Sequence, residues 1–252
     1  SLACRPLNPM PHMSPLKALS AALSLCFVFG ASLASADSFP ADLDAVRFSG
    51  PDITPCPACL AVSATGEVYA GVDLHGSLGK GPGKGSIVKL RDIDGDGVAD
   101  EHTVFALIDN PRGIIAIGTK LYVLHTAYGD DDLSIGMNLV VLEDANRDGI
   151  ADGPPEILVS GICSPTNINN RGTDHSTNGI RMGIDGWIYI AVGDFGFHDA
   201  TGTDGTRITL LGGGIVRVRP DGSELEQYTT GTRNIYDIAI DPFLNAFTRG
   251  NT

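Results

Sequence analysis

The sequence has 252 residues and is strongly acidic, with 30 Asp and Glu against 17 Lys and Arg and a formal net charge of −13 at pH 7. Such a surface repels phosphate backbones and anionic lipids, which argues against nucleic-acid binding and against attachment to an anionic membrane surface. It suits divalent cations and neutral substrates.

The N-terminal segment predicts export. Residues 1–12 are interpreted as sequence upstream of the start at Met13, or as the edge of a fragment. Residues 13–36 have the three parts of a secretory signal: a basic residue, an apolar run over residues 18–34 and a small-residue cleavage site. The apolar run is shorter than the about 20 residues of a membrane span. We expect the mature protein to begin at Asp37 and to be periplasmic or secreted.

Three cysteines follow the signal segment. Cys56 and Cys59 form a C-x-x-C pair, but Leu60 stands where a haem-attachment motif requires histidine. The pattern therefore predicts no haem in this segment. In an oxidising compartment we expect a disulfide between Cys56 and Cys59, or between one of them and Cys163.

A repeated unit organises the remaining chain. Apolar alternation around a tight turn predicts four β-hairpins, over residues 60–71, 114–125, 180–193 and 237–249. Later strands follow the first three hairpins, at residues 86–90, 138–142 and 214–222. An aromatic residue recurs at the same place in each hairpin: Tyr69, Tyr122, Tyr189 and Phe247. Repetition at about 50 residues indicates a repeated supersecondary structure.

These features predict an all-β protein, specifically a β-propeller of four-stranded blades. A solenoid is the alternative, although solenoid repeats are usually shorter and more uniform. The third unit is longer because residues 194–213 are inserted between its strands, and long loops on β scaffolds often carry function. About three and a half blades fit in residues 37–252, so we interpret this range as the N-terminal part of a propeller domain and the sequence as a fragment.

Two acidic loops, over residues 92–100 and 144–152, share the pattern D-x-[DN]-x-D-G-x-A-D. Oxygen ligands at alternate positions around a turn glycine are typical of calcium-binding loops. The candidate ligands are Asp92, Asp94, Asp96 and Asp100 in the first loop, and Asp144, Asn146, Asp148 and Asp152 in the second. Neither loop has the bidentate Glu that completes an EF-hand, so a hydrated acidic turn that binds weakly or not at all is the alternative.

The strings 174-DHSTNGIRMGIDGWIYIAVGDFG-196 and 231-GTRNIYDIAIDPFLN-245 resemble the six-bladed propellers of soluble quinoprotein glucose and sorbosone dehydrogenases. The closer resemblance is to secreted dehydrogenase-like propellers of planctomycete-type bacteria, which are often fused to a cytochrome c domain. The resemblance covers most of the chain from about Cys56. It implies about three and a half blades of six, and a cytochrome c domain downstream as a partner.

This resemblance implies roles for four residues. His175 would take the hydroxyl proton of a sugar or alcohol while hydride passes to pyrroloquinoline quinone, and Asp194 would orient His175. Arg233 and Asn234 would contact the quinone. The sequence departs from the dehydrogenase pattern at Asn178, where the step from histidine to arginine is longer.

Three functions remain open from the sequence. The first is a quinone-dependent sugar or alcohol dehydrogenase. The second is a non-catalytic propeller that binds carbohydrate or a partner domain and uses calcium to stiffen its loops. The third is a metal-dependent lactonase, which needs a cluster of Glu, Asn and Asp in the central channel that Asn234 and Asp194 alone do not supply.

Overall fold

In the computed structural model, residues 43, 45–76 and 81–250 are described. The chain divides into two units at Val46, and all described strands belong to the second, residues 47–252. Among the described residues, no helix has the length and the apolar character that a membrane crossing requires.

Two regions named in the sequence analysis lie outside the described residues. These are the expected signal segment, residues 13–36, and residues 1–12 that precede it. Export and the mature start at Asp37 therefore stay predictions.

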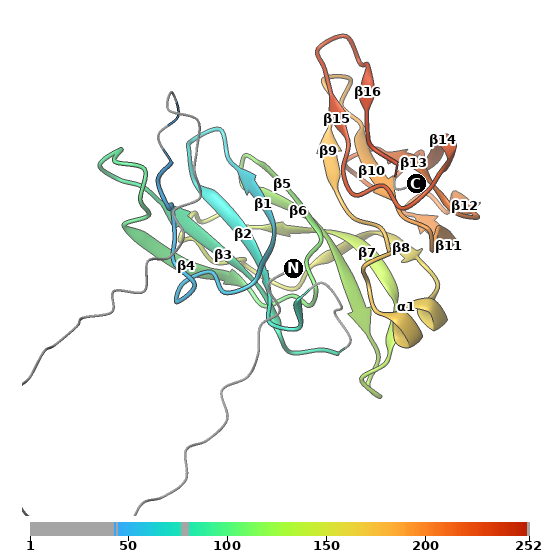
Figure 1. Cartoon of the computed structure of the whole chain (residues 1–252), viewed down its shortest axis with the longest axis horizontal. Coiled ribbons are helices and arrows are strands. Elements are labelled where there is room, and N and C mark those ends of the chain that lie inside the picture. Colours follow the sequence, from blue (N-terminus) through green and yellow to red (C-terminus); the bar gives the residue numbers. More distant parts are fainter. Residues whose placement is uncertain (1–42, 44, 77–80, 251–252) are drawn as a thin grey trace, which may run out of the picture. The chain divides into compact units, whose positions relative to one another are not determined.

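The first sheet of the second unit is a four-stranded antiparallel blade with the strand order β1-β2-β3-β4 (Figure 1). Its strands are β1 (Pro57–Val62), β2 (Val68–Asp73), β3 (Gly85–Arg91) and β4 (Glu101–Ala106). The first predicted hairpin is confirmed as β1 and β2, and the later strand as β3. Each strand pairs with the next along the chain, so short connections suffice.

The second blade repeats this arrangement. Its strands are β5 (Gly113–Ile117), β6 (Lys120–Tyr128), β7 (Ser134–Glu143) and β8 (Glu156–Ile162). The helix α1 (Pro165–Arg171) follows β8. Ser164 caps it by accepting a hydrogen bond from the Asn167 backbone N–H, Pro165 occupies its first turn, and Gly172 follows it with φ of 83°.

The third blade has the order β9-β10-β13-β14, and a fourth hairpin comes after it. Their strands are β9 (Ile180–Met182), β10 (Ile188–Val192), β13 (Gly213–Val218), β14 (Glu226–Thr232), β15 (Ala239–Ile240) and β16 (Ala246–Phe247). The described part thus contains three four-stranded blades and one further hairpin, which confirms the predicted all-β propeller and its three and a half blades.

The insertion in the third unit forms a hairpin of its own, β11 (Phe197–Gly202) and β12 (Arg207–Leu210). It does not join the third blade. Instead β11 pairs with β8, with Phe197 opposite Ile162, and extends the second sheet to six strands (Figure 1). The insertion therefore ties the third unit to the outer edge of the second blade.

The inner hairpins turn at residues with positive φ. Gly66, Gly118 and Gly186 have φ of 93°, 61° and 77°, a region that glycine enters without steric cost. In the fourth hairpin, Leu244 has φ of 65°. We call the end of the blades with these turns the turn end, and the end where β1, β5, β9 and β15 begin the entry end.

Two apolar clusters hold neighbouring blades together face to face. Ile87 and Phe105 of the first blade pack with Leu121 and Val140 of the second. Between the second and third blades the packing residues include Leu139, Ile162, Val192 and Phe197. Each interface takes alternate residues of a strand, and a strand packed on both faces, such as β10, is buried along its whole length.

The expected disulfide is wrong, because none of the three described cysteines forms one. Cys163 is fully buried in the cluster between the second and third blades and shares a hydrogen bond with Thr177. Cys59 packs against the cluster between the first and second blades, directly beside Gly71, and burial raises its pKa to about 12. The two thiols are therefore held in different cores.

Candidate functional site

A histidine and an acid meet at the entry end of the third blade. His175 lies between α1 and β9, and Asp194 follows β10, so the β9-β10 hairpin brings their segments together. The Nδ1 atom of His175 lies 2.9 Å from an Asp194 carboxylate oxygen. The backbone N–H of Phe195 also donates to the carbonyl of His175 at 3.1 Å. With Nδ1 engaged, Nε2 is the ring nitrogen that can accept a proton.

Gly193 makes this approach possible. A Cβ atom at this position would lie 2.2 Å from the carbonyl oxygen of Ser176 and 2.5 Å from that of His175. Only a residue without a side chain lets the end of β10 come this close to the His175 segment.

The segment that carries His175 is buried and tied to both neighbouring blades. The side-chain oxygen of Asn178 accepts a hydrogen bond of 2.6 Å from Arg112 at the start of the second blade. Its amide nitrogen donates to the carbonyl of Ile235, which precedes the fourth hairpin, at 3.3 Å. Asn178 is fully buried, so the departure from the dehydrogenase pattern has a structural function: it joins three units beneath the histidine.

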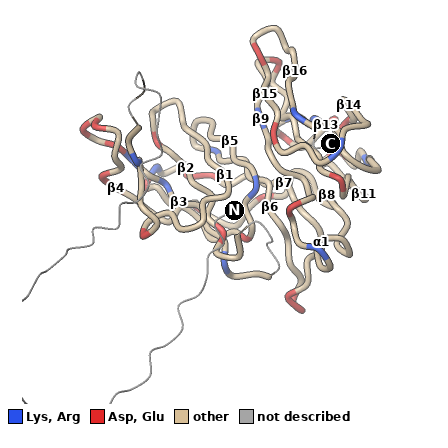
Figure 2. The backbone as a smooth tube through the Cα atoms, in the orientation of Figure 1, with Lys and Arg blue, Asp and Glu red and all other residues tan. Residues whose placement is uncertain are grey.

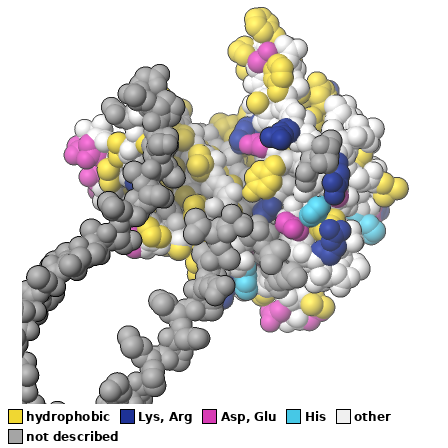
Figure 3. Space-filling view, viewed as in Figure 1, with side chains coloured by type: hydrophobic (Ala, Val, Ile, Leu, Met, Phe, Trp, Pro, Cys, Tyr) yellow, Lys and Arg dark blue, Asp and Glu magenta, His cyan; other side chains and the backbone are white. Residues whose placement is uncertain are grey.

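Phe195 contacts the imidazole, and Arg171 contacts Phe195 in turn. The ring of Phe195 stacks on that of His175 with 5.9 Å between centroids and 26° between planes. Arg171, the last residue of α1, places its guanidinium carbon 5.2 Å from the Phe195 centroid. Figure 3 shows histidine, basic and acidic side chains gathered on one face near the third sheet and α1.

The next unit contributes Arg233 and Asn234 at the same end. The Nε atom of Arg233 lies 3.6 Å from the Asp194 carboxylate, and its side chain is 58% exposed. The amide nitrogen of Asn234 donates to the carbonyl of Asp174 at 3.2 Å, and its side-chain oxygen is buried without a hydrogen-bond partner among the described residues. Arg233 therefore faces solvent beside the His175–Asp194 pair, while Asn234 tethers the neighbouring segment.

The first acidic loop joins β3 and β4 at the turn end (Figure 2). The carboxylates of Asp92, Asp94 and Asp100 place oxygens within 4.8 Å of one another. Asp92 also accepts hydrogen bonds from the backbone N–H groups of Gly95 and Gly97, at 2.7 and 2.9 Å. The Asp96 carboxylate accepts a hydrogen bond from the backbone N–H of Val98 in the same loop.

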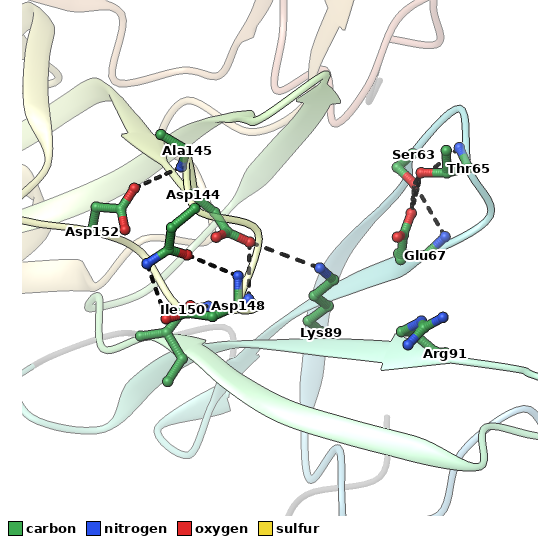
Figure 4. A network of polar contacts seen from close by, with 12 residues as sticks. Ser63, Thr65, Glu67, Lys89, Arg91, Asp144, Ala145, Asp148, Ile150 and Asp152 are labelled. Atoms are coloured by element: carbon green, nitrogen blue, oxygen red, sulfur yellow. Dashed lines mark hydrogen bonds and ion pairs between the residues drawn. The ribbon is translucent and has the colours of Figure 1, made fainter.

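The second acidic loop joins β7 and β8 and repeats most of the internal hydrogen bonds of the first, but its leading Asp144 accepts one side-chain hydrogen bond where Asp92 accepts two. One oxygen of Asp144 accepts the Gly149 N–H at 3.0 Å, while the other is buried and has no hydrogen-bond partner among the described residues. Asp148 accepts from Asn146 and from the Ile150 backbone. Asp152 accepts the Ala145 N–H at 2.6 Å and closes the loop (Figure 4). A cation would satisfy the remaining Asp144 oxygen.

A family model described as a domain of unknown function, DUF7133, matches residues 50–252. The chain belongs to the DUF7133 family. No curated protein sequence matches it.

Among the solved structures that are similar to this DUF7133 chain are two dehydrogenases. One, described as an oxidoreductase (glucose dehydrogenase) from Thermus thermophilus, has 15% identity and a TM-score of 0.51 over 77% of this chain and 58% of its own. The other is the pyrroloquinoline quinone-bound aldose sugar dehydrogenase of Streptomyces coelicolor, with 19% identity and a TM-score of 0.51 over 77% of this chain and 55% of its own. The likeness shows the propeller fold, and the chain spans less than two thirds of either structure.

Some residues of the DUF7133 site escaped sequence reasoning. Phe195 lies within the string 174–196 but was given no role, Arg171 lies outside that string, and Asn178 counted only as a departure. Phe195 directly follows Asp194, so its position beside a rim acid was the available signal. No sequence signal pointed to Arg171, because its contact with Phe195 depends on the position of α1.

Proposed function

We propose that this DUF7133 propeller belongs to a sugar or alcohol dehydrogenase that uses pyrroloquinoline quinone. The observation that carries the proposal is the His175–Asp194 hydrogen bond of 2.9 Å, with Arg233 against the same carboxylate. A base, the acid that orients it and a fixed positive charge are then within one small region of the entry end.

Each side chain has a defined part in this chemistry. Asp194 holds the N–H of His175 Nδ1, which leaves Nε2 to take the proton of a substrate hydroxyl. When bound, the quinone would accept the hydride from the substrate carbon that bears this hydroxyl. Arg233 is exposed and its Nε lies 3.6 Å from the Asp194 carboxylate, so the solvent-facing part of its guanidinium fits an anionic group of a quinone. Asn234 would support this contact by fixing the Asp174–His175 segment.

The two similar structures support the proposal at the level of fold. One is described as a glucose dehydrogenase and the other holds the quinone, and both are propellers like this chain. A sugar substrate for the DUF7133 protein is consistent with both descriptions, and a cytochrome c domain that receives the electrons is part of the proposal.

Calcium is proposed for both acidic loops. The bonding of Asp144 favours it, because one oxygen stabilises the turn through Gly149 while the other is buried and unsatisfied. A carboxylate with one free oxygen in a loop of alternating oxygen ligands is suited to calcium. Bound calcium would stiffen the turn end, which also suits the alternative of a non-catalytic propeller.

We also propose that the protein is exported, on the basis of the signal pattern in residues 13–36. Mass spectrometry of the N-terminus from the native cell tests this: a mature start near Asp37 supports export, and retention of residues 18–34 contradicts it.

Quinone binding tests the proposed function directly. The complete gene product would be titrated with pyrroloquinoline quinone in the presence of calcium, together with Arg233→Met and a control, Arg207→Met. Arg207 is an exposed arginine of the β11-β12 hairpin that pairs with Asp199. We expect Arg233→Met to weaken binding about tenfold or more, because a charge-assisted contact is lost, and Arg207→Met to leave it unchanged. A wild-type protein that does not bind the quinone would contradict the proposal and favour the alternative of a non-catalytic propeller that binds carbohydrate or a partner domain.

A further inference from the structure

A cavity of about 430 Å³ lies between the first and second blades at the turn end. Its walls come from the β1-β2 turn, β3, β4, the β5-β6 turn and the second acidic loop. The volume is within the range of small-molecule sites. Because His175 lies at the entry end, this cavity is separate from the site described above. Figure 4 shows Glu67, Lys89 and Arg91 of the first blade on one side, and Asp144 and Asp148 of the second on the other.

Lys89 is central to this cavity. Its side chain is only 14% exposed, and its ammonium lies 3.9 Å from the nearer Asp144 oxygen, too far for a hydrogen bond. It also lies 5.8 Å from the centroid of the Tyr69 ring. No described residue accepts a hydrogen bond from this ammonium. The ammonium itself is not fully buried, and in the cavity its hydrogen bonds go to a ligand or to water.

The charges around the cavity argue for a neutral ligand. The bases Lys89, Arg91 and Arg147 face at least as many acids, among them Glu67, Glu101 and Asp144. Glu67 stays ionised, because hydrogen bonds from the Ser63 and Thr65 hydroxyls lower its pKa to about 2. The acids would repel a phosphate or carboxylate ligand, and the bases would repel a polyamine. A hydroxyl group both donates and accepts, so it can satisfy a carboxylate and an ammonium at once.

We propose that this cavity binds a neutral polyhydroxylated ligand, a mono- or disaccharide, through hydrogen bonds to Lys89 and Glu67. The buried oxygen of Asp144 is not needed for it and stays available to calcium. The inference does not depend on catalysis at His175. A propeller with both sites would hold one saccharide at its entry end and another at its turn end.

Calorimetric titration of the complete gene product tests this, with cellobiose as the neutral probe, glucose 6-phosphate as the anionic probe and putrescine as the cationic probe. The variants are Lys89→Met, which keeps the alkyl chain but removes the charge, and Ala64→Trp, which fills the exposed mouth of the cavity at the β1-β2 turn. Since Ala64 is exposed, the second variant should fold even if the first does not. We expect cellobiose to bind more tightly than either charged probe, and both variants to weaken it about tenfold or more.

His175→Ala is the control that separates the two sites. Cellobiose binding that survives His175→Ala and is lost in Ala64→Trp supports the cavity, whether or not the protein oxidises sugars. No binding of cellobiose, binding unaffected by both cavity variants, or a preference for glucose 6-phosphate or putrescine would overturn the proposal.

Discussion

The ring of Phe195 stacks on the imidazole of His175, with their centroids 5.9 Å apart and their planes 26° from parallel. Phe195 is 9% exposed and belongs to the core between the second and third blades. It lies two residues before the start of β11, which pairs with β8. The orientation of the histidine is therefore fixed by the core and by the neighbouring blade as well as by Asp194.

Replacing Phe195 tests this connection. Phe195→Ala removes a buried ring and leaves a cavity, so we expect it to lower the free energy of unfolding by about 3 kcal/mol or more. Phe195→Leu keeps most of the apolar volume and should cost under about 2 kcal/mol. Urea unfolding followed by circular dichroism measures both. A cost below about 1 kcal/mol for Phe195→Ala would show that the ring is not packed as described.

Gly193 gives a second test of the local packing. Gly193→Ala places a methyl group 2.2 Å from the Ser176 carbonyl and 2.5 Å from that of His175, so the end of β10 and the His175 segment must separate. We expect a loss of about 1–3 kcal/mol in the free energy of unfolding. The matched control is Gly153→Ala, where nothing lies within 4 Å of the new methyl group and little change is expected. Equal stabilities for the two variants would contradict the close approach.

The acidic loops predict calcium-dependent stability. Calcium should raise the melting temperature of the wild-type protein, because it binds the folded loops in preference to the unfolded chain. A variant with Asp96→Ala and Asp148→Ala loses one ligand from each loop and should lose most of this increase. Asp130→Asn, an exposed acid outside both loops, is the charge control. If calcium neither binds nor stabilises the wild type, both loops are ordinary turns.

His125 predicts acid sensitivity. Burial lowers its pKa from 6.5 to about 4, and its Nδ1 has no hydrogen-bond partner among the described residues. The neutral ring is favoured in the folded state, so its contribution to stability is full above pH 6.5 and is lost as the pH falls towards 4. The loss should reach roughly 2–4 kcal/mol. Urea unfolding of wild type and His125→Asn between about pH 7.5 and 4 measures it. Equal pH dependence of the two proteins would contradict the assignment.

The sequence predicts the hairpins well because local features determine them. These are the alternating apolar residues of the strands and a glycine at the turn of each of the first three hairpins. It also predicts that His175 and Asp194 approach each other, since the two ends of one hairpin must meet. The pairing of β11 with β8 was not predictable, because an insertion can join any free sheet edge nearby. The disulfide prediction failed because C-x-x-C spacing does not show how two thiols are oriented, and because the sequence does not show that Cys59 and Cys163 enter different cores.

The central claim, that His175 is a general base, is tested most directly by dye-linked oxidation of aldoses with the complete gene product, reconstituted with pyrroloquinoline quinone and calcium. The comparison is between wild type, His175→Ala and His198→Ala, which changes an exposed histidine of the insertion. We predict that His175→Ala lowers the rate roughly 100-fold or more, while His198→Ala keeps it. An active wild type whose His175→Ala variant oxidises aldoses at the full rate would contradict the account.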